Sequence, residues 1–202
     1  TNKINLELNH DDFRFETGLQ SFENLRIKNQ SDRYQYVLPY YNFDKNISKN
    51  YFNGNISFNS NGSNVLDNTN KLETNFTNNL TYNSIDFISN LGFKNNFGIN
   101  LKNLNSVGKK SAKYKSSIQS ELVSLYNLDV SLPLKKDSQK FKNYLTPKMS
   151  LRINPHDMKN YSSSARNIDA HNAFAINRLG LSDTLESGRS LTLGLDYLNE
   201  RK

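Results

Sequence analysis

Polar and apolar side chains alternate along much of this chain, most clearly in the segment KLETNFTNNLTYN between Lys71 and Asn83. A β-strand sends successive side chains to opposite faces. This segment therefore has one face rich in Leu, Phe and Tyr, and one face of carboxylate, amide and hydroxyl groups. The same period continues from Ile85 to Asn103, a run far longer than the usual strand of about five or six residues. A membrane barrel with lipid outside and water inside requires this pattern.

The composition favours a membrane barrel over a soluble or disordered chain. Only 35% of the 202 residues are hydrophobic, and the mean hydropathy is -0.75. Such a chain would struggle to fill a soluble core, and disorder is the obvious rival. The 11 Tyr and 12 Phe are nevertheless placed in alternation, enough to coat one surface but not two packed sheets. No run of about 18 apolar residues occurs, which excludes a transmembrane helix.

Alternation and turn residues together predict about ten strands. The predicted strands are Asn2–Asn9, Phe13–Ile27, Arg33–Phe43, Tyr51–Ser60, Lys71–Asn83, Ile85–Asn103, Lys113–Leu132, Tyr144–Ile153, Ala170–Leu181 and Ser190–Asn199. We expect an all-β fold, an antiparallel up-and-down segment of a larger transmembrane β-barrel. Alone it should form an open curved sheet or an artificially closed small barrel. Because the chain starts and stops in strand patterns, we expect it to be an internal piece of a longer protein.

The connections and the prolines carry further expectations. Residues 61–70, 106–112 and 154–169 are predicted to be long polar loops, the last of them extracellular, because outer-membrane barrels have longer loops outside than in the periplasm. Pro39 and Pro147 each remove a backbone donor inside a predicted strand. We interpret each as a local kink or bulge, against the alternative of a broken strand.

Catalytic and metal-binding patterns are weak. His10, His156 and His171 lack metal-ligand spacing, and the chain has no cysteine. The serines at 162–164 lie near Asp169 and His171 but lack the glycines of a nucleophile elbow. The net charge of +7 raises the question of nucleic-acid binding. The basic residues, however, form no recognisable binding module, and no phosphate-binding glycine loop occurs. We therefore expect no enzyme, no cofactor and no nucleic-acid partner.

Basic residues recur on the polar side of the predicted strands. The four that would face the lumen of a barrel are Lys94, Lys102, Lys148 and Arg152. There they could hold phosphorylated or carboxylated glycolipid head groups by charge-assisted hydrogen bonds. The alternative is that they only solvate a wet wall and pair with nearby acids, namely Glu73, Asp86, Glu121 and Asp129.

The C-terminal third carries a more specific pattern. The segment LTPKMSLRINP at Leu145–Pro155 is followed by a polar loop and then by NAFAINRLGLSDTLESGRSLTLGLDY at Asn172–Tyr197. Together with SFENLRIKNQSDRYQYVLPYYNF at Ser21–Phe43, this arrangement resembles the barrel of the LptD family, also called OstA. The matching positions of the Asn-Arg-x-Gly-x-x-Asp element and its continuation are Asn177, Arg178, Gly180, Asp183, Glu186, Gly188 and Gly194. We expect a structural role for them: the glycines permit bends, and Arg178 ties the loop to a strand end by pairing with Asp169, Asp183 or Glu186.

The resemblance implies a role in assembling lipopolysaccharide in the outer leaflet of the Gram-negative outer membrane. LptD proteins look like barrels of about 26 strands, preceded by a periplasmic jelly-roll domain and plugged by the lipoprotein LptE. They receive lipopolysaccharide from a periplasmic bridge. Residues 1–202 would then be part of the C-terminal barrel domain, without the jelly roll, and the cysteines that join the family's two domains have no counterpart here.

Two other classes share the alternation. A general porin or a TonB-dependent receptor would lack the Asn-Arg-x-Gly-x-x-Asp element. A surface adhesin or soluble β-sandwich would bury its apolar face beneath a second sheet. The residues that separate a sandwich from a barrel are Phe87, Leu91, Phe93 and Phe97, which a sandwich packs under protein and a barrel exposes.

Overall fold

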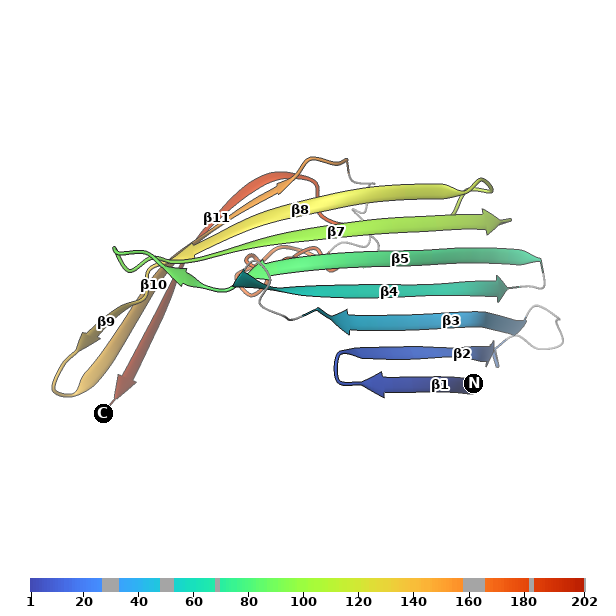
Figure 1. Cartoon of the computed structure of the whole chain (residues 1–202), viewed down its shortest axis with the longest axis horizontal. Coiled ribbons are helices and arrows are strands. Elements are labelled where there is room, and N and C mark those ends of the chain that lie inside the picture. Colours follow the sequence, from blue (N-terminus) through green and yellow to red (C-terminus); the bar gives the residue numbers. More distant parts are fainter. Residues whose placement is uncertain (27–32, 48–52, 68–69, 158–165, 182–183, 202) are drawn as a thin grey trace. The chain divides into compact units, whose positions relative to one another are not determined.

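The computed structural model describes residues 1–26, 33–47, 53–67, 70–157, 166–181 and 184–201, and these residues form strands and turns without an α-helix (Figure 1). The strands are β1 (Asn2–His10), β2 (Phe13–Glu23), β3 (Tyr34–Asn46), β4 (Gly54–Asp67), β5 (Lys71–Ser84), β6 (Phe87–Ile88), β7 (Lys94–Lys109), β8 (Gln119–Ser131), β9 (Leu134–Asp137), β10 (Phe141–Asn154) and β11 (Gly188–Arg201). A helix with the length and apolarity that a membrane crossing requires is absent from this described part of the chain.

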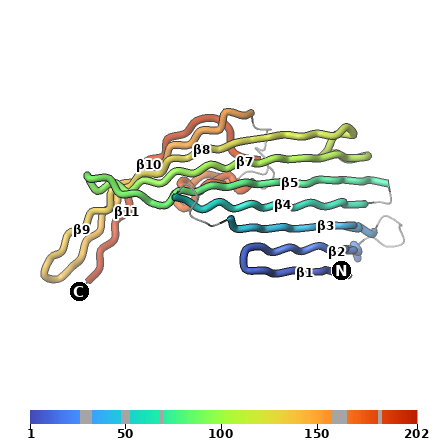
Figure 2. Tube along the Cα trace, viewed as in Figure 1, coloured from blue at the N-terminus to red at the C-terminus, as the bar shows by residue number. Residues whose placement is uncertain are grey.

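The strands form one open sheet that follows the chain. Its order is β1-β2-β3-β4-β5-β7-β8-β10-β11, with the short β6 and β9 pairing with β7 and β10 (Figure 2). Every pairing resolved residue by residue is antiparallel. The sheet is not closed, because β1 pairs with β2 and β11 with β10 at its two edges. The predicted all-β, antiparallel, open architecture is confirmed.

The chain divides into two compact units. Unit 1 comprises Thr1–Lys49, Ile56–Leu80 and Leu101–Leu122, and unit 2 comprises Asn50–Asn55, Thr81–Asn100 and Val123–Lys202. Each is described separately below.

Unit 1 has two chemically different faces at β1 and β2. Ile4 lies opposite Leu19 in the register, and Leu8 lies opposite Phe15. Ile4 is 75% exposed, so no layer of described residues covers this face. On the other face the Lys3 ammonium lies 2.8 Å from the Glu16 carboxylate. The alternation read from the sequence is therefore expressed as one bare apolar face and one face of paired charges.

Pro39 lies in β3 at an irregularity, as expected. The register with β4 shifts between Val37 and Tyr40, and the register with β2 shifts between Gly18 and Gln20. The shift aims Tyr40 across β2, where a Cβ built on Gly18 would lie 2.9 Å from Tyr40 Oη. The strand continues on both sides of the proline, so the kink interpretation is correct and a broken strand is excluded. Pro147 likewise lies within the continuous strand β10.

A ladder of polar side chains crosses unit 1 on the face that carries the apolar residues of β5. Tyr41 Oη lies 3.1 Å from Ser60 Oγ, which donates to Asn78 Oδ1 at 2.7 Å. Asn78 Nδ2 donates to Asn103 Oδ1 at 3.2 Å, and Asn103 Nδ2 donates to Ser120 Oγ at 3.3 Å. We name these five residues the amide ladder. Each amide is satisfied by its neighbours, which is how polar groups are tolerated on an apolar surface.

In unit 2, the residues expected to separate a barrel from a sandwich are all uncovered. Phe87, Leu91, Phe93 and Phe97 are between 38% and 80% exposed. No second layer of described protein packs on them, which is the arrangement expected of a barrel wall and not of a β-sandwich.

The prediction of one strand over Ile85–Asn103 is wrong. The structure has β6 and β7 joined by a turn in which Gly92 takes a φ of +83° and its N–H donates to the carbonyl of Ser89 at 2.9 Å. Glycine adopts this left-handed conformation without the clash of a Cβ. The sequence pattern did not indicate the turn, because apolar residues alternate with polar ones both before and after it.

The prediction of a strand over Ala170–Leu181 is also wrong, since these residues form turns and irregular chain. Asp169 Oδ1 accepts the backbone N–H groups of His171 and Asn172, and the Asp169 carbonyl accepts that of Ala173. Such local bonds compete with the ladder of a strand.

Several strand ends differ from the expected positions. The loop expected over 61–70 is mostly strand, since β4 extends to Asp67, and β7 extends to Lys109 into the loop expected over 106–112. Residues 134–137 form β9, a hairpin partner of β10 that the sequence reading did not predict. Small polar residues such as Asn and Ser signal turns, but here cross-strand hydrogen bonding keeps them in strands.

Candidate functional site

The side chains of β10 alternate between two faces in unit 2. Met149 and Leu151 lie opposite Leu193 and Leu191 of β11, and both leucines of β11 are exposed. The residues of β10 on the other face are polar: Lys148, Ser150, Arg152 and Asn154. We name this side, with the β8 and β11 residues opposite these four, the polar face of unit 2.

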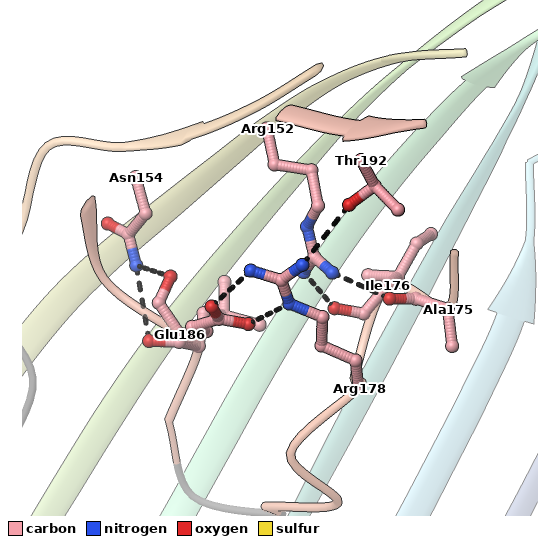
Figure 3. Close-up of polar contacts among 8 residues, drawn as sticks. Arg152, Asn154, Ala175, Ile176, Arg178, Glu186 and Thr192 are labelled. Carbon is pink, nitrogen blue, oxygen red and sulfur yellow. Dashed lines mark hydrogen bonds and ion pairs between the residues drawn. The ribbon is translucent and has the colours of Figure 1, made fainter. Parts of the chain in front are cut away.

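The described residues 166–181 and 184–187 of the loop between β10 and β11 are tied to this polar face by Arg152 (Figure 3). Its guanidinium donates from Nη1 to the carbonyl of Ala175 at 2.6 Å and from Nη2 to the carbonyl of Ile176. The residue is 4% exposed. A buried guanidinium with five donors in a fixed fork is well suited to hold two successive carbonyls.

Asn154, at the end of β10, forms a second attachment. Its Nδ2 donates to the carbonyls of Leu185 at 3.2 Å and Glu186 at 3.0 Å (Figure 3). Leu185 then packs against Val123 and Leu125 of β8, forming the buried apolar cluster of the described residues. The loop therefore covers Val123 and Leu125, the buried aliphatic side chains of the described strand residues.

Arg178 and Glu186 join the two arms of the loop by a bidentate ion pair. Arg178 Nε and Nη2 each donate to a Glu186 carboxylate oxygen at 2.5 Å, and Nη1 donates to Thr192 Oγ1 of β11 at 3.3 Å (Figure 3). The two side chains are 9% and 20% exposed. The hydrogen bonds that Arg178 donates to Glu186 raise the pKa of Arg178 above its ordinary value, and burial opposes this rise. Of the other acids considered for Arg178, Asp169 caps the turn at residues 171–173 instead, and Asp183 lies outside the described residues.

The motif residues Asn177, Gly180, Gly188 and Gly194 shape the same loop. Asn177 closes a turn on Leu181, accepting its N–H at 3.0 Å and donating to its carbonyl at 2.6 Å. Gly180 and Gly188 have φ values of +70° and +87°, which favour glycine. The geometry gives every described member of the motif a place in the loop or at its junction with β11.

Lys148 meets the loop through an aromatic ring. Its Nζ lies 2.8 Å from Asp196 Oδ2 and 4.4 Å from the centroid of Phe174. The ring of Phe174 fits over β11 because residue 194 is Gly: a Cβ there would lie 2.7 Å from Phe174 Cζ. The glycine therefore allows a close approach of loop and strand.

The remaining predicted lumen residues are Lys94 and Lys102. Lys94 Nζ pairs with Asp86 at 2.8 Å, one of the acids named in the pairing alternative. Lys102 is 7% exposed and interacts with other residues. Lys94 and Lys148 line a cavity of about 290 Å³ with Asp86, Asp129 and Phe174, so its charges are nearly balanced. Whether these basic residues face a lumen remains a prediction.

Three residues important to this site were missed by the sequence reading: Asn154, Phe174 and Leu185. Asn154 shares its side of β10 with Lys148 and Arg152, and that two-residue spacing was the available signal. Phe174 and Leu185 lie in a segment without regular periodicity, so nothing local marked them. In the described part of the chain no three His, Cys, Asp or Glu side chains gather as metal ligands. The serines at 162–164 lie outside the described residues.

The sequence matches the LptD family, described as LPS transport system D, over residues 1–198. No curated protein matches the chain. Since the match covers nearly the whole chain, and since the open antiparallel sheet agrees with a section of a barrel, the chain belongs to the LptD family of lipopolysaccharide transport proteins of the outer membrane.

Proposed function

We propose that this chain is a section of the wall of an outer-membrane translocon that delivers lipopolysaccharide to the outer leaflet. Residues 1–202 would form part of the C-terminal barrel domain, its strands crossing the bilayer. The role is transport without a chemical reaction. The plug lipoprotein of the LptE type and the periplasmic bridge that supplies lipopolysaccharide would be its partners, as membership of the family suggests.

The observation that carries this proposal is the contrast between the two sides of β10 and β11. Leu191, Leu193 and Leu195 stand exposed on one side, with exposures of 59%, 71% and 62%. The other side presents charged and amide groups and holds the loop. A strand pair with one apolar and one polar side is expected to face hydrocarbon on the apolar side and water on the polar side.

The polar side of the wall would contact the saccharide and phosphate portions of the cargo. Its donors and acceptors are spread over many positions and are largely paired with each other, as Lys94 is with Asp86 and Lys148 with Asp196. Weak, distributed contacts suit a conduit, because a single tight site would slow release. The loop between β10 and β11 would lie inside the conduit against the wall and narrow it.

Photocrosslinking in cells that assemble the full-length protein tests the proposal. A benzoylphenylalanine at Lys94, on the polar side, should crosslink to lipopolysaccharide, and the crosslink should disappear when lipopolysaccharide synthesis is stopped. The same probe at Leu193, on the apolar side, should crosslink to resident lipid whether or not synthesis continues. Crosslinks at Leu193 that vanish with synthesis, or none at Lys94, would contradict the assignment of the two sides.

A further inference from the structure

The connection between β7 and β8 (Figure 1), counted from the last residue of β7 and so covering residues 109–118, carries a concentration of positive charge that the export role does not use. It contains four lysines within seven residues, Lys109, Lys110, Lys113 and Lys115, and all four are exposed. Four ammonium groups on one short connection attract anions, and the attraction extends about a Debye length from the surface.

The lysines are held on a structured connection. Ser111 Oγ accepts the backbone N–H groups of Lys113 and Tyr114, both at 2.9 Å, and donates to Glu73 Oε1 of β5 at 2.7 Å. The N–H of Gly108 donates to the carbonyl of Lys115 at 2.8 Å. The ammonium groups are therefore displayed from a fixed backbone, which reduces the entropy lost on binding.

Carboxylate contacts are unevenly distributed over the four lysines, and Lys113 has such a contact. Glu73 also pairs with Lys71 at 3.3 Å and interacts electrostatically with Lys113. Among the described residues, none of the ion pairs includes Lys109, Lys110 or Lys115. The connection keeps a strong net positive charge.

Apolar side chains lead directly to these lysines. Ile118, the last residue of the connection, and Leu122, near the start of β8, are 81% and 60% exposed. Tyr114 is half-buried, with the Lys113 ammonium 5.0 Å from its ring centroid. Exposed aliphatic groups, a tyrosine and lysines in this order are typical of the boundary between hydrocarbon and head groups.

The connection also offers neutral donors beside the lysines. A cavity of about 560 Å³ is lined by Lys110, Lys113 and Lys115 together with the serines at 111, 116 and 117. Ammonium and hydroxyl groups are the donors that phosphate oxygens accept from. A cavity open on one side suits a group that is presented from a surface.

We propose that the β7–β8 connection, residues 109–118, binds the phosphate groups of lipids in the bilayer surrounding the barrel, with Ile118 in the acyl region. The proposed ligand is the surrounding lipid and not the exported cargo. It would fix the height of these strand ends in the membrane and collect phosphorylated lipid around them.

A tryptophan reporter tests this proposal, since the 202 residues contain no tryptophan. The full-length protein with Ile118→Trp is placed in vesicles of phosphatidylglycerol and phosphatidylcholine, with either lipid brominated on its acyl chains. Subtracting the signal of the protein without the reporter isolates the quenching at residue 118. We expect quenching by both lipids, with at least about fivefold preference for phosphatidylglycerol, the factor that one lysine near an anionic surface provides.

Matched charge removals show which lysines are responsible. The first variant replaces the four lysines of the connection, K109Q, K110Q, K113Q and K115Q, and should reduce the preference to about onefold. The control removes the same charge from the β9–β10 hairpin, K135Q, K136Q, K140Q and K142Q, and should leave the preference at residue 118 unchanged. If both variants lose the lipid preference equally, the proposal of a site at residues 109–118 is overturned.

Two further outcomes would overturn the assignment to membrane lipid. If neither of the two brominated lipids quenches the reporter, residue 118 lies away from the bilayer. Loss of the lipid preference on adding millimolar inorganic phosphate, at constant ionic strength, would assign the site to free phosphate. Retention of the preference in phosphate and its decrease with added sodium chloride are the results expected of a lipid head-group site.

Discussion

Replacement of Arg178 by Met would leave the Glu186 carboxylate in place without its bidentate partner. Removing one member of a fully buried ion pair costs about 3–5 kcal/mol. Arg178 and Glu186 retain 9% and 20% exposure, so a cost of about 2–3 kcal/mol is expected here. The loss falls on the attachment of the loop, because both partners lie within or beside it while the hydrogen bonds between β10 and β11 remain.

Hydrogen exchange of the loop amides measures this loss directly. The N–H groups of Gly180 and Leu181, which bond to Asn177 in the native loop, report on local opening. A cost of about 2–3 kcal/mol corresponds to roughly 30- to 150-fold faster exchange. Amides in the β10–β11 ladder should keep their rates. Lys135→Gln, which breaks the exposed ion pair with Asp137, is the control. It should leave the exchange rates of both the loop amides and the ladder amides unchanged.

A double replacement separates the ion pair from general disruption. With Arg178→Met and Glu186→Met together, no unpaired charge remains, and exchange should return much of the way toward the native rate. If Arg178→Met leaves the exchange of Gly180 and Leu181 unchanged, the ion pair does not hold the loop and the reasoning fails. The reasoning also fails if the free-energy change of the double variant equals the sum of the changes of the two single variants.

Three further substitutions test other parts of the structure. Gly194→Val should displace Phe174, whose ring a Cβ would approach to 2.7 Å, and destabilise the loop by about 1–3 kcal/mol; unchanged exchange around residue 174 would contradict this. Leu195→Lys should reduce the free energy of unfolding in vesicles by up to about 2–4 kcal/mol, whereas Thr146→Lys, on the same side of β10 as Lys148, should be tolerated. The folded fraction is measured by the heat-modifiable band shift, and equal effects of the two changes would refute the division of faces. Asn78→Leu should destabilise the sheet by about 0.5–1.5 kcal/mol although Leu is more apolar, because the amide ladder loses its centre; an increase in urea resistance would refute it.

Much of the sheet could be predicted because its signal is local. Alternation with a period of two shows in each segment by itself, and it identified β1, β2, β5, β10 and β11 to within a few residues. It failed between 85 and 103, where a glycine turn lies between two runs of the same alternation, and between 170 and 181, where capping side chains replace the ladder. In both places a short-range backbone preference outweighs the periodic pattern.

The loop site was less predictable. Arg178 and Glu186 were recognised as motif residues with a structural part to play, but the choice of Glu186 among three nearby acids depends on how the loop turns. Arg152 was predicted from its side of the strand, yet its partners are the carbonyls of residues 175 and 176. Backbone carbonyls occur at every residue, so no sequence pattern indicates which of them a side chain reaches.

The sequence by itself determined that this chain forms strands with one oily and one wet side, because side-chain direction in a strand follows from chain position alone. The sequence also shows the family relationship, through the match over residues 1–198. Tertiary structure alone decided that the loop after β10 folds onto the wet side and that polar side chains of five strands join on the oily side of unit 1. Those contacts unite residues distant in the chain, and their free energy exists only when strand register and loop path bring the groups within hydrogen-bonding distance.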